Sequence, residues 1–326
     1  MIDAKMATTG EAIAKPAKAA QPVEERKAAA GPIAATGRFF SRSAIHLVII
    51  AVVVLWSIPT LALLISSFRE PSAIATTGWW NALTGSWDFT LSNYDQVLNQ
   101  RNMDRAFINS LIISVPSTIL SILVASMAAY AFAWMQFPFK NVLFLVVVGL
   151  LVVPLQMTLI PVLRIYSDIT IETEMPLIGG NLFGVNSFAG MWIAHTAYGL
   201  PFAVFLLRNF FAALPRDLFE SAYLDGASDI TVFTRIVLPL SGPALAALGI
   251  FQFLWIWNDL LIALIYLGDP ELAPMTLTIR NLVSSFGTQY QFLTSAAFIS
   301  MALPLLIFFA LQRYFVQGVL AGSVKG

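Results

Sequence analysis

The sequence predicts an all-α integral membrane protein with six transmembrane helices. Of its 326 residues, 58% are hydrophobic and only 11% are charged, and the mean hydropathy is +0.78. Six uncharged windows separate the charged residues, and each is at least 23 residues long, whereas a membrane-spanning helix needs about 20 apolar residues. Core helices of soluble proteins, the alternative interpretation, usually have apolar stretches of only about 10–14 residues. The six windows are Ser43–Phe68, Ala106–Phe139, Asn141–Leu163, Met175–Leu207, Ile236–Asn258 and Asn281–Gln312.

The N-terminal region differs from the rest of the chain. Residues 1–43 are rich in Ala, Lys, Glu and Pro and show no apolar periodicity, so they can bury too little surface to fold. We therefore predict a disordered cytoplasmic N-terminal tail (residues 1–43) and a six-helix transmembrane domain (residues 44–326). The apolar run that begins near Ala44 is too long for the core of a secretory signal peptide, so we expect it to remain as the first span.

The distribution of Lys and Arg predicts the orientation of the spans. With the tail inside, 13 of these residues lie on the inside and 5 on the outside, which by the positive-inside rule puts both termini in the cytoplasm. The loop of residues 213–241 is then cytoplasmic too. The chain has no cysteine, which excludes disulfides, thiolate nucleophiles and cysteine zinc sites. Its net charge is zero, so the sequence shows no nucleic-acid-binding surface.

The loop of residues 213–241 predicts a short helix–turn–helix between the fourth and fifth spans. Pro215 suits the first turn of a helix, Gly226 suits its end, and Ser228 or Asp229 could cap a second short helix. Such an element could lie passively among lipid headgroups or could dock a cytoplasmic partner. The physical pattern leaves both interpretations open. Apolar residues fall on one face of the first helix, at Leu218, Phe219, Ala222 and Tyr223.

The same loop resembles the EAA loop of ABC importer permeases. Glu220-Ser221-Ala222 is followed after three residues by Gly226 and, nine residues later, by Ile236-Val237-Leu238-Pro239, which is the spacing of that family. Ser221 departs from the usual alanine. Between residues 44 and 326 the chain is also similar to the sugar-permease branch that includes the maltose transporter G-type subunit. The stretches that carry this similarity are Val153–Pro161, Leu200–Phe211, Trp257–Leu267 and Gln312–Gly326.

The resemblance implies a type I ABC importer permease of the bacterial cell inner membrane. It would import a carbohydrate or sugar derivative by alternating access. The implied partners are two copies of an ABC ATP-binding subunit, a second permease subunit in a heterodimer, an extracytoplasmic solute-binding protein and membrane lipid. The loop would be the coupling helix, seated in the ATP-binding subunit. The residues implied for ATPase coupling are Glu220, Ser221, Ala222, Asp225, Gly226, Ala227, Leu238 and Pro239.

The chain lacks a phosphate-binding loop of the form G-x-x-x-x-G-K-[ST]. We therefore expect no ATPase activity, no cofactor and no catalytic or metal site in this chain, with ATP and Mg bound by the partner ATPase. An intramembrane serine protease is disfavoured, because Ser228 lies in a charged loop and both histidines precede it. An ion-coupled secondary transporter that uses Asp259 is the alternative function, since such transporters keep ionisable groups at membrane depth.

Polar residues near the end of the fifth span suggest a substrate path. A carboxylate at membrane depth is costly and normally faces protein or water, and an aromatic ring with hydrogen-bonding groups suits a sugar. If the span begins near Gly242, Gln252, Trp255 and Asp259 share one helical face. A polar packing patch between helices is the competing interpretation. His195, a histidine within a predicted span, is expected to be a packed, hydrogen-bonded residue rather than a ligand or proton relay. The possible path residues are Gln252, Trp255, Asn258 and Asp259.

Overall fold

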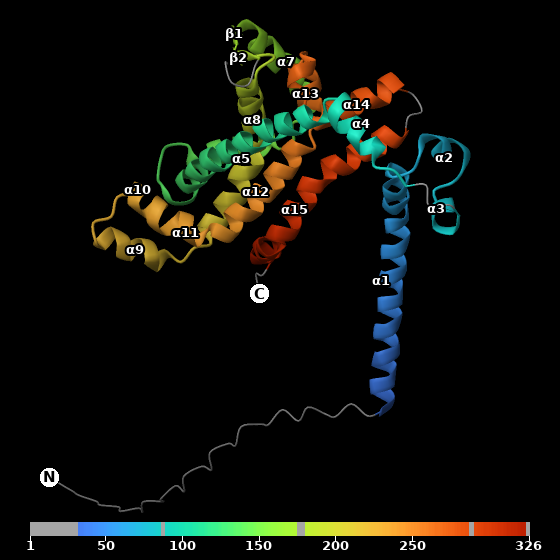
Figure 1. Ribbon diagram of the computed structural model, residues 1–326. Helices are drawn as coiled ribbons and strands as arrows, with labels where there is room; N and C mark the ends of the chain where they lie inside the picture. Colours follow the sequence, from blue (N-terminus) through green and yellow to red (C-terminus); the bar gives the residue numbers. More distant parts are fainter. Residues whose placement is uncertain (1–31, 86–88, 175–179, 287–289, 324–326) are drawn as a thin grey trace, which may run out of the picture. The chain divides into compact units, whose positions relative to one another are not determined.

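The computed structural model describes residues 32–85, 89–174, 180–286 and 290–323, and the chain falls into two compact units, Met1–Ile58 and Pro59–Gly326. Helix α1 (Pro32–Ser67) begins twelve residues before the predicted boundary at residue 44 (Figure 1). Residues 32–43, assigned to the tail, are therefore helical, and their alanines and the proline in the first turn favour this. Residues 1–31, the rest of the predicted tail, lie outside the described residues.

The first part of α1 exposes its apolar side chains. Leu47, Leu55 and Trp56 are 67%, 70% and 82% exposed, although the helix carries no charge between Ala44 and Ser67. Since a soluble helix would cover such a surface, this exposure fits a helix surrounded by lipid.

The second unit begins with three short helices before its long ones. Arg69 is buried and fixes the first of them, because its guanidinium donates hydrogen bonds to the carbonyl oxygens of Ala73 and Gly78. These helices are α2 (Pro71–Thr76), α3 (Asn81–Thr84) and α4 (Ser92–Gln100).

Four long helices form the core of the second unit. Helix α5 packs along α8 and α12, and α12 packs on α15 (Figure 1). Small residues on one face of α5 allow this close approach, as is typical of helices packed in membranes. The buried small residues of α5 include Ser110, Ser114, Ser117, Ser121, Ala125 and Ala129. The long helices are α5 (Met103–Trp134), α8 (Phe188–Ala212), α12 (Gly242–Trp257) and α15 (Tyr290–Ser323).

Two predicted spans are bent rather than straight. Helices α6 (Lys140–Leu150) and α7 (Leu155–Asp168) meet at 103°, so the continuous helix expected over 141–163 is wrong. Pro154 explains the break, because a proline restricts the residue before it and cannot continue a helix. The segment Asp229–Leu240 likewise meets Gly242–Trp257 at 75°.

The described residues thus contain four helices long and apolar enough to cross a membrane, and six spans when each bent pair counts as one. This agrees with the predicted all-α fold of six spans. The four are Ala44–Ser67, Met103–Trp134, Phe188–Ala212 and Tyr290–Gln312.

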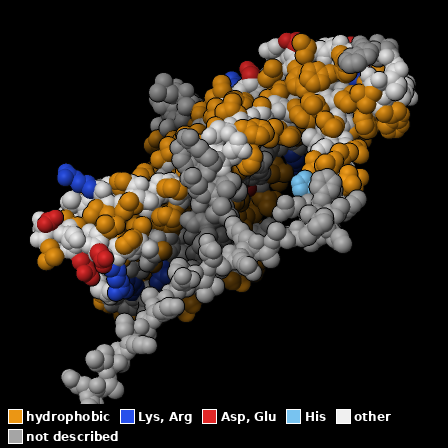
Figure 2. Space-filling view, turned by 90° about the horizontal axis from the view of Figure 1, so that it is seen from below, with side chains coloured by type: hydrophobic (Ala, Val, Ile, Leu, Met, Phe, Trp, Pro, Cys, Tyr) orange, Lys and Arg blue, Asp and Glu red, His pale blue; other side chains and the backbone are white. Residues whose placement is uncertain are grey.

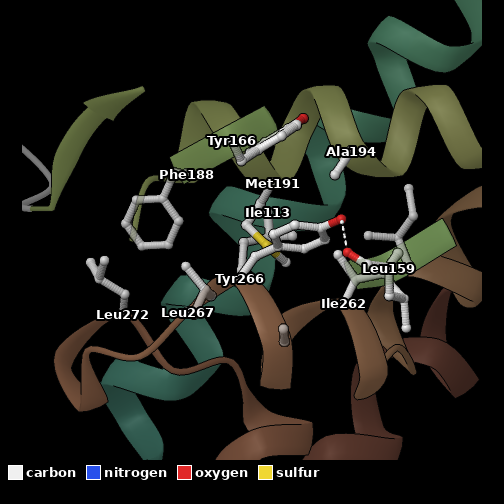
Figure 3. Packing of buried hydrophobic residues seen from close by; sticks show 12 residues of the cluster. Ile113, Leu159, Tyr166, Phe188, Met191, Ala194, Ile262, Tyr266, Leu267 and Leu272 are labelled. Carbon is white, nitrogen blue, oxygen red and sulfur yellow. Dashed lines mark hydrogen bonds between the residues drawn. The ribbon is translucent and has the colours of Figure 1, made fainter. Parts of the chain in front are cut away.

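A cluster of short elements closes one end of the core. The antiparallel strands β1 (Ile171–Glu174) and β2 (Asn181–Phe183) pair Ile171 with Phe183, a hairpin that the sequence did not predict. Figure 3 shows the apolar cluster beneath it, where the Tyr266 hydroxyl donates to the Leu159 carbonyl oxygen at 3.3 Å. The remaining elements are α13 (Leu261–Tyr266), a 3-10 turn (Pro270–Leu272) and α14 (Met275–Phe286).

Candidate functional site

Residues 213–241, which we call the coupling loop, fold into the predicted helix–turn–helix. The elements lie together at one end of the core, away from α13 and α14 (Figure 1). Figure 2 shows charged side chains gathered at the end of the molecule where Figure 1 places α9 and α10. The elements of the coupling loop are α9 (Arg216–Leu224), α10 (Asp229–Val232), a π-helical turn (Phe233–Val237) and α11 (Leu238–Leu240).

Gly226 makes the turn between α9 and α10. Its φ is +82°, a left-handed conformation that glycine adopts without a Cβ clash, so the predicted role of this residue is confirmed. The N–H of Gly226 donates to the Tyr223 carbonyl oxygen, and the N–H of Ala227 donates to that of Ala222, each at 3.0 Å. No atom lies within 4 Å of the position that a Cβ on Gly226 would take. The turn is therefore constrained by backbone conformation and not by packing.

The ends of the two helices differ slightly from the prediction. Of the two expected caps, Ser228 caps α10, since its hydroxyl accepts a hydrogen bond from the Thr231 N–H. The Asp229 carboxylate instead accepts from the Tyr223 hydroxyl at 2.7 Å. Pro215 lies one residue before α9, with a ψ of 130°, and not in its first turn. The extended backbone at this proline directs the chain from α8 into α9.

Aromatic contacts fix the coupling loop to the long helices. Phe219 of α9 is 2% exposed and stacks on Trp134, the last residue of α5, with ring centroids 3.6 Å apart. The Trp134 indole N–H donates to the Phe211 carbonyl oxygen of α8 at 3.0 Å. A movement of α9 would therefore be transmitted to the ends of α5 and α8.

Tyr223 forms a second connection. Its hydroxyl lies 3.4 Å from that of Tyr130 on α5. Burial and the hydrogen bonds with Tyr130 and Asp229 raise the pKa of Tyr223 above its ordinary value, so the phenol stays protonated and donates to Asp229.

The outer face of the coupling loop combines charged and apolar side chains. Leu224 is 88% exposed and Ile230 is 75% exposed, on either side of the Gly226 turn. Neither residue is among those predicted from the sequence, although apolar side chains beside a polar turn are a signal of an exposed contact surface. Exposed leucine and isoleucine among charges are typical of a protein-docking surface. Of the residues predicted for coupling, the exposed ones are Glu220, Ser221, Asp225, Gly226 and Pro239, and the half-buried ones are Ala222, Ala227 and Leu238.

Of the three residues predicted to share one helical face, Gln252 and Trp255 lie three residues apart in α12, but Asp259 lies beyond its end. Gln252 is 3% exposed, and its amide donates to the Ser121 hydroxyl at 3.3 Å. Trp255 is 39% exposed, and Asn258 is exposed as well. Asp259 lies beyond the end of α12, where its carboxylate accepts the N–H groups that begin α13. The predicted single face is wrong because α12 ends at Trp257.

His195 lies beside two of these residues. It is 1% exposed, and its ring meets that of Trp255 edge to face, with centroids 5.7 Å apart. Its Nε2 lies 3.9 Å from a carboxylate oxygen of Asp259. The residue is packed, as expected. The described residues contain no group of three or more acidic, histidine or cysteine side chains that could hold a metal ion.

Comparison with known proteins agrees with this geometry. Residues 106–321 match the family described as "Binding-protein-dependent transport system inner membrane component". The chain is 50% identical over 291 residues to the "Osmoprotective compounds uptake permease protein GgtD" of Synechocystis sp., with 88% of this chain and 93% of the relative covered. It is 40% identical to the "Alpha-glucoside transport system permease protein AglG" of Rhizobium meliloti, with 87% and 97% covered.

The fold is also similar to a solved structure. A chain of a bacterial ABC transporter "involved in the import of the acidic polysaccharide alginate" superposes with a TM-score of 0.69 at 18% identity, with 86% of this chain and 98% of that chain covered. At this identity the likeness concerns the fold alone.

Proposed function

The chain belongs to the family of binding-protein-dependent transport system inner membrane components, and it is a membrane permease subunit of an ABC importer; from this premise we propose that its coupling loop docks an ATP-binding subunit and that its cargo is a glycoside. The observation that carries the proposal is the coupling loop itself. It presents Leu224, Ile230 and Glu220 outward while Phe219 fixes it to α5.

The partners follow from what the chain lacks. It has no phosphate-binding loop, so a separate subunit must bind ATP and Mg. The complete importer then comprises two ATP-binding subunits, this chain with a second permease subunit in a heterodimer, and an extracytoplasmic solute-binding protein. The coupling loop and both termini face the cytoplasm, in agreement with the excess of Lys and Arg on that side.

The mechanism is alternating access. Closure of the ATP-binding subunits draws the coupling loops together, and each loop moves the ends of α5 and α8 through Phe219 and Trp134. ATP thereby selects one of two packings of the same helices, and hydrolysis returns the other.

The relatives support a small glycoside as cargo. Two proteins that match this chain over nearly their whole length are named for osmoprotective compounds and for α-glucosides. Within this chain we assign Trp255 and Asn258 to the path, because both are exposed near the end of α12. The indole can stack on a sugar ring and the amide can hydrogen-bond its hydroxyls. Gln252 is buried and bonded to the Ser121 hydroxyl, and the Asp259 carboxylate accepts backbone N–H groups of α13, so we assign neither a direct contact with the cargo.

Substitution of Trp255 tests the path assignment. Trp255→Ala should lower ATP-dependent uptake of an α-glucoside, because the path loses its stacking surface, while the complex still assembles. Trp255→Phe, which keeps a ring, is the matched control and should retain most of the uptake. Uptake is measured in proteoliposomes with all subunits present. If Trp255→Ala transports as well as the native chain, Trp255 belongs only to helix packing.

A further inference from the structure

A small cavity with polar and apolar side chains in its wall lies where α5, α8 and the turn between α12 and α13 meet. Its volume is about 10 Å³, and His195, Asp259, Ser110 and Ser114 contribute the polar side chains of its wall. Both serines and the histidine are at least 98% buried. The transport mechanism described above does not use this cavity.

His195 connects Trp255 to a fixed carboxylate. Its ring lies edge to face against the indole, with an interplanar angle of 89°. On its other side, Nε2 lies 3.9 Å from the Asp259 carboxylate, which is too long for a hydrogen bond. That carboxylate cannot move freely, because it accepts hydrogen bonds from the N–H groups of Ile262 and Ala263 at 3.1 and 3.2 Å.

The other ring nitrogen of His195 has no hydrogen-bond partner among the described residues. A neutral imidazole has one donor and one acceptor nitrogen, and the carboxylate near Nε2 favours the hydrogen on that atom. Nδ1 is then a buried acceptor that needs a donor, and leaving it unsatisfied is costly.

The cavity has room for that donor. A single water molecule needs about 10–15 Å³ and two to four polar partners. His195, Asp259, Ser110 and Ser114 line this cavity, and among their side chains Nδ1 of His195 is a buried polar atom without a partner in the described part of the chain.

We propose that one ordered water molecule occupies this cavity and donates a hydrogen bond to Nδ1 of His195, and that His195 is thereby a positioning residue for the indole of Trp255. The inference rests on the assignment of Trp255 to the substrate path. Fixed at Nδ1 by the water, the imidazole holds the indole at one orientation toward the cargo.

A double-mutant cycle tests the positioning role. His195→Leu, Trp255→Ala and the double variant are compared for ATP-dependent uptake of an α-glucoside by the complete importer. His195→Leu should lower uptake about three- to tenfold, the range expected for residues in contact. Because His195 acts through Trp255, the double variant should transport no worse than Trp255→Ala alone.

The outcomes separate this inference from the proposed function. If Trp255→Ala lowers uptake and the two losses multiply, His195 acts independently of Trp255 and the positioning role falls, while the path assignment stands. If Trp255→Ala leaves uptake unchanged, Trp255 does not line the path, and His195 then has no positioning role.

His195→Asn is the matched control for the water molecule. An asparagine amide can keep a polar atom near the position of Nδ1, so this variant should recover at least half of the uptake lost in His195→Leu. Equal loss in both variants would mean that ring packing alone matters. Independently of any variant, a high-resolution cryo-EM map of the native importer should show a water about 2.7–3.2 Å from Nδ1. A dry cavity in that map would overturn the proposal.

Discussion

At Gly226 the backbone φ is +82°, and the space around a Cβ at this position is empty. A side chain here is therefore resisted by the backbone conformation alone, at about 1–2 kcal/mol. Valine is worse than alanine, because its branched side chain is also restricted at χ1. We therefore expect a substitution of Gly226 to distort only the turn between α9 and α10, because the six apolar spans that drive membrane insertion are unchanged.

Gly226→Val should leave the protein in the membrane at near-normal abundance and weaken the binding of the ATP-binding subunit. The measurement is co-purification of that subunit, normalised to membrane abundance. Gly226→Asn is the matched control, because asparagine enters the left-handed region more readily, and it should bind better than the valine variant. Full binding by Gly226→Val would show that the turn is not needed for docking.

Glu220 tests the charge of the docking surface. It is exposed on α9, one residue from the buried Phe219. Glu220→Lys should reduce co-purification of the ATP-binding subunit and transport without changing abundance, because it reverses a charge on the docking surface but removes no packing. Glu220→Gln should have a smaller effect. Raising the salt concentration should narrow the difference between the two variants, since exposed charges are screened. No difference at low salt would place Glu220 outside the interface.

At the scale of the elements, the stacked pair Phe219 and Trp134 joins α9 to the end of α5. Phe219→Ala removes a buried aromatic side chain, a change that costs about 3–5 kcal/mol in a packed core. Since the contact lies between two elements, the loss should loosen α9 and leave the packing of α5 on α8 intact.

The expected result for Phe219→Ala is an importer whose ATP hydrolysis no longer responds fully to the substrate-loaded binding protein. Spin labels on α9 and at the end of α5 should report a broader distance distribution than in the native chain. Leu218→Ala is the matched control, because Leu218 is 42% exposed on the same helix, and it should behave like the native chain. An unchanged distance distribution in Phe219→Ala would contradict the coupling route through this pair.

The elements also show what the sequence could and could not predict. The six apolar windows predict spans because the thickness of the hydrocarbon core sets a minimum length, and the Gly226 turn is a local backbone requirement. The bend of 103° between α6 and α7 was missed, because apolar residues surround Pro154 on both sides. Hydropathy does not distinguish a straight helix from a broken one.

The predicted position of Asp259 on the face of Gln252 and Trp255 is wrong for a different reason. Placing Gln252, Trp255 and Asp259 on one face assumed a helix that continues beyond Trp257. Where α12 ends depends on tertiary contacts and on the Asp259 carboxylate, which begins α13 instead. His195 and Asp259 are 64 positions apart in the sequence, so no local sequence pattern reveals that their side chains lie close together.

On the scale of the whole molecule, the chain is a permease subunit of an ABC importer. The coupling loop, where we propose that the ATP-binding subunit docks, lies at one end of the long helices, and the residues assigned to the path lie near the far end of α12. The long helices between them are packed through small residues, so a displacement at one end can be passed along them. We therefore expect transport to require both an ATP-binding subunit at the coupling loop and a delivered substrate.

Uptake by reconstituted importer tests this account most directly. Proteoliposomes are prepared with this chain, the second permease subunit, the ATP-binding subunit and the substrate-loaded binding protein. Accumulation of a radiolabelled α-glucoside is then measured. ATP is either supplied to the compartment that contains the ATP-binding subunit or left out. The account predicts accumulation only when all four proteins and ATP are present, and none when an ion gradient replaces ATP. Accumulation by this chain alone, or accumulation driven by an ion gradient without ATP, would contradict it.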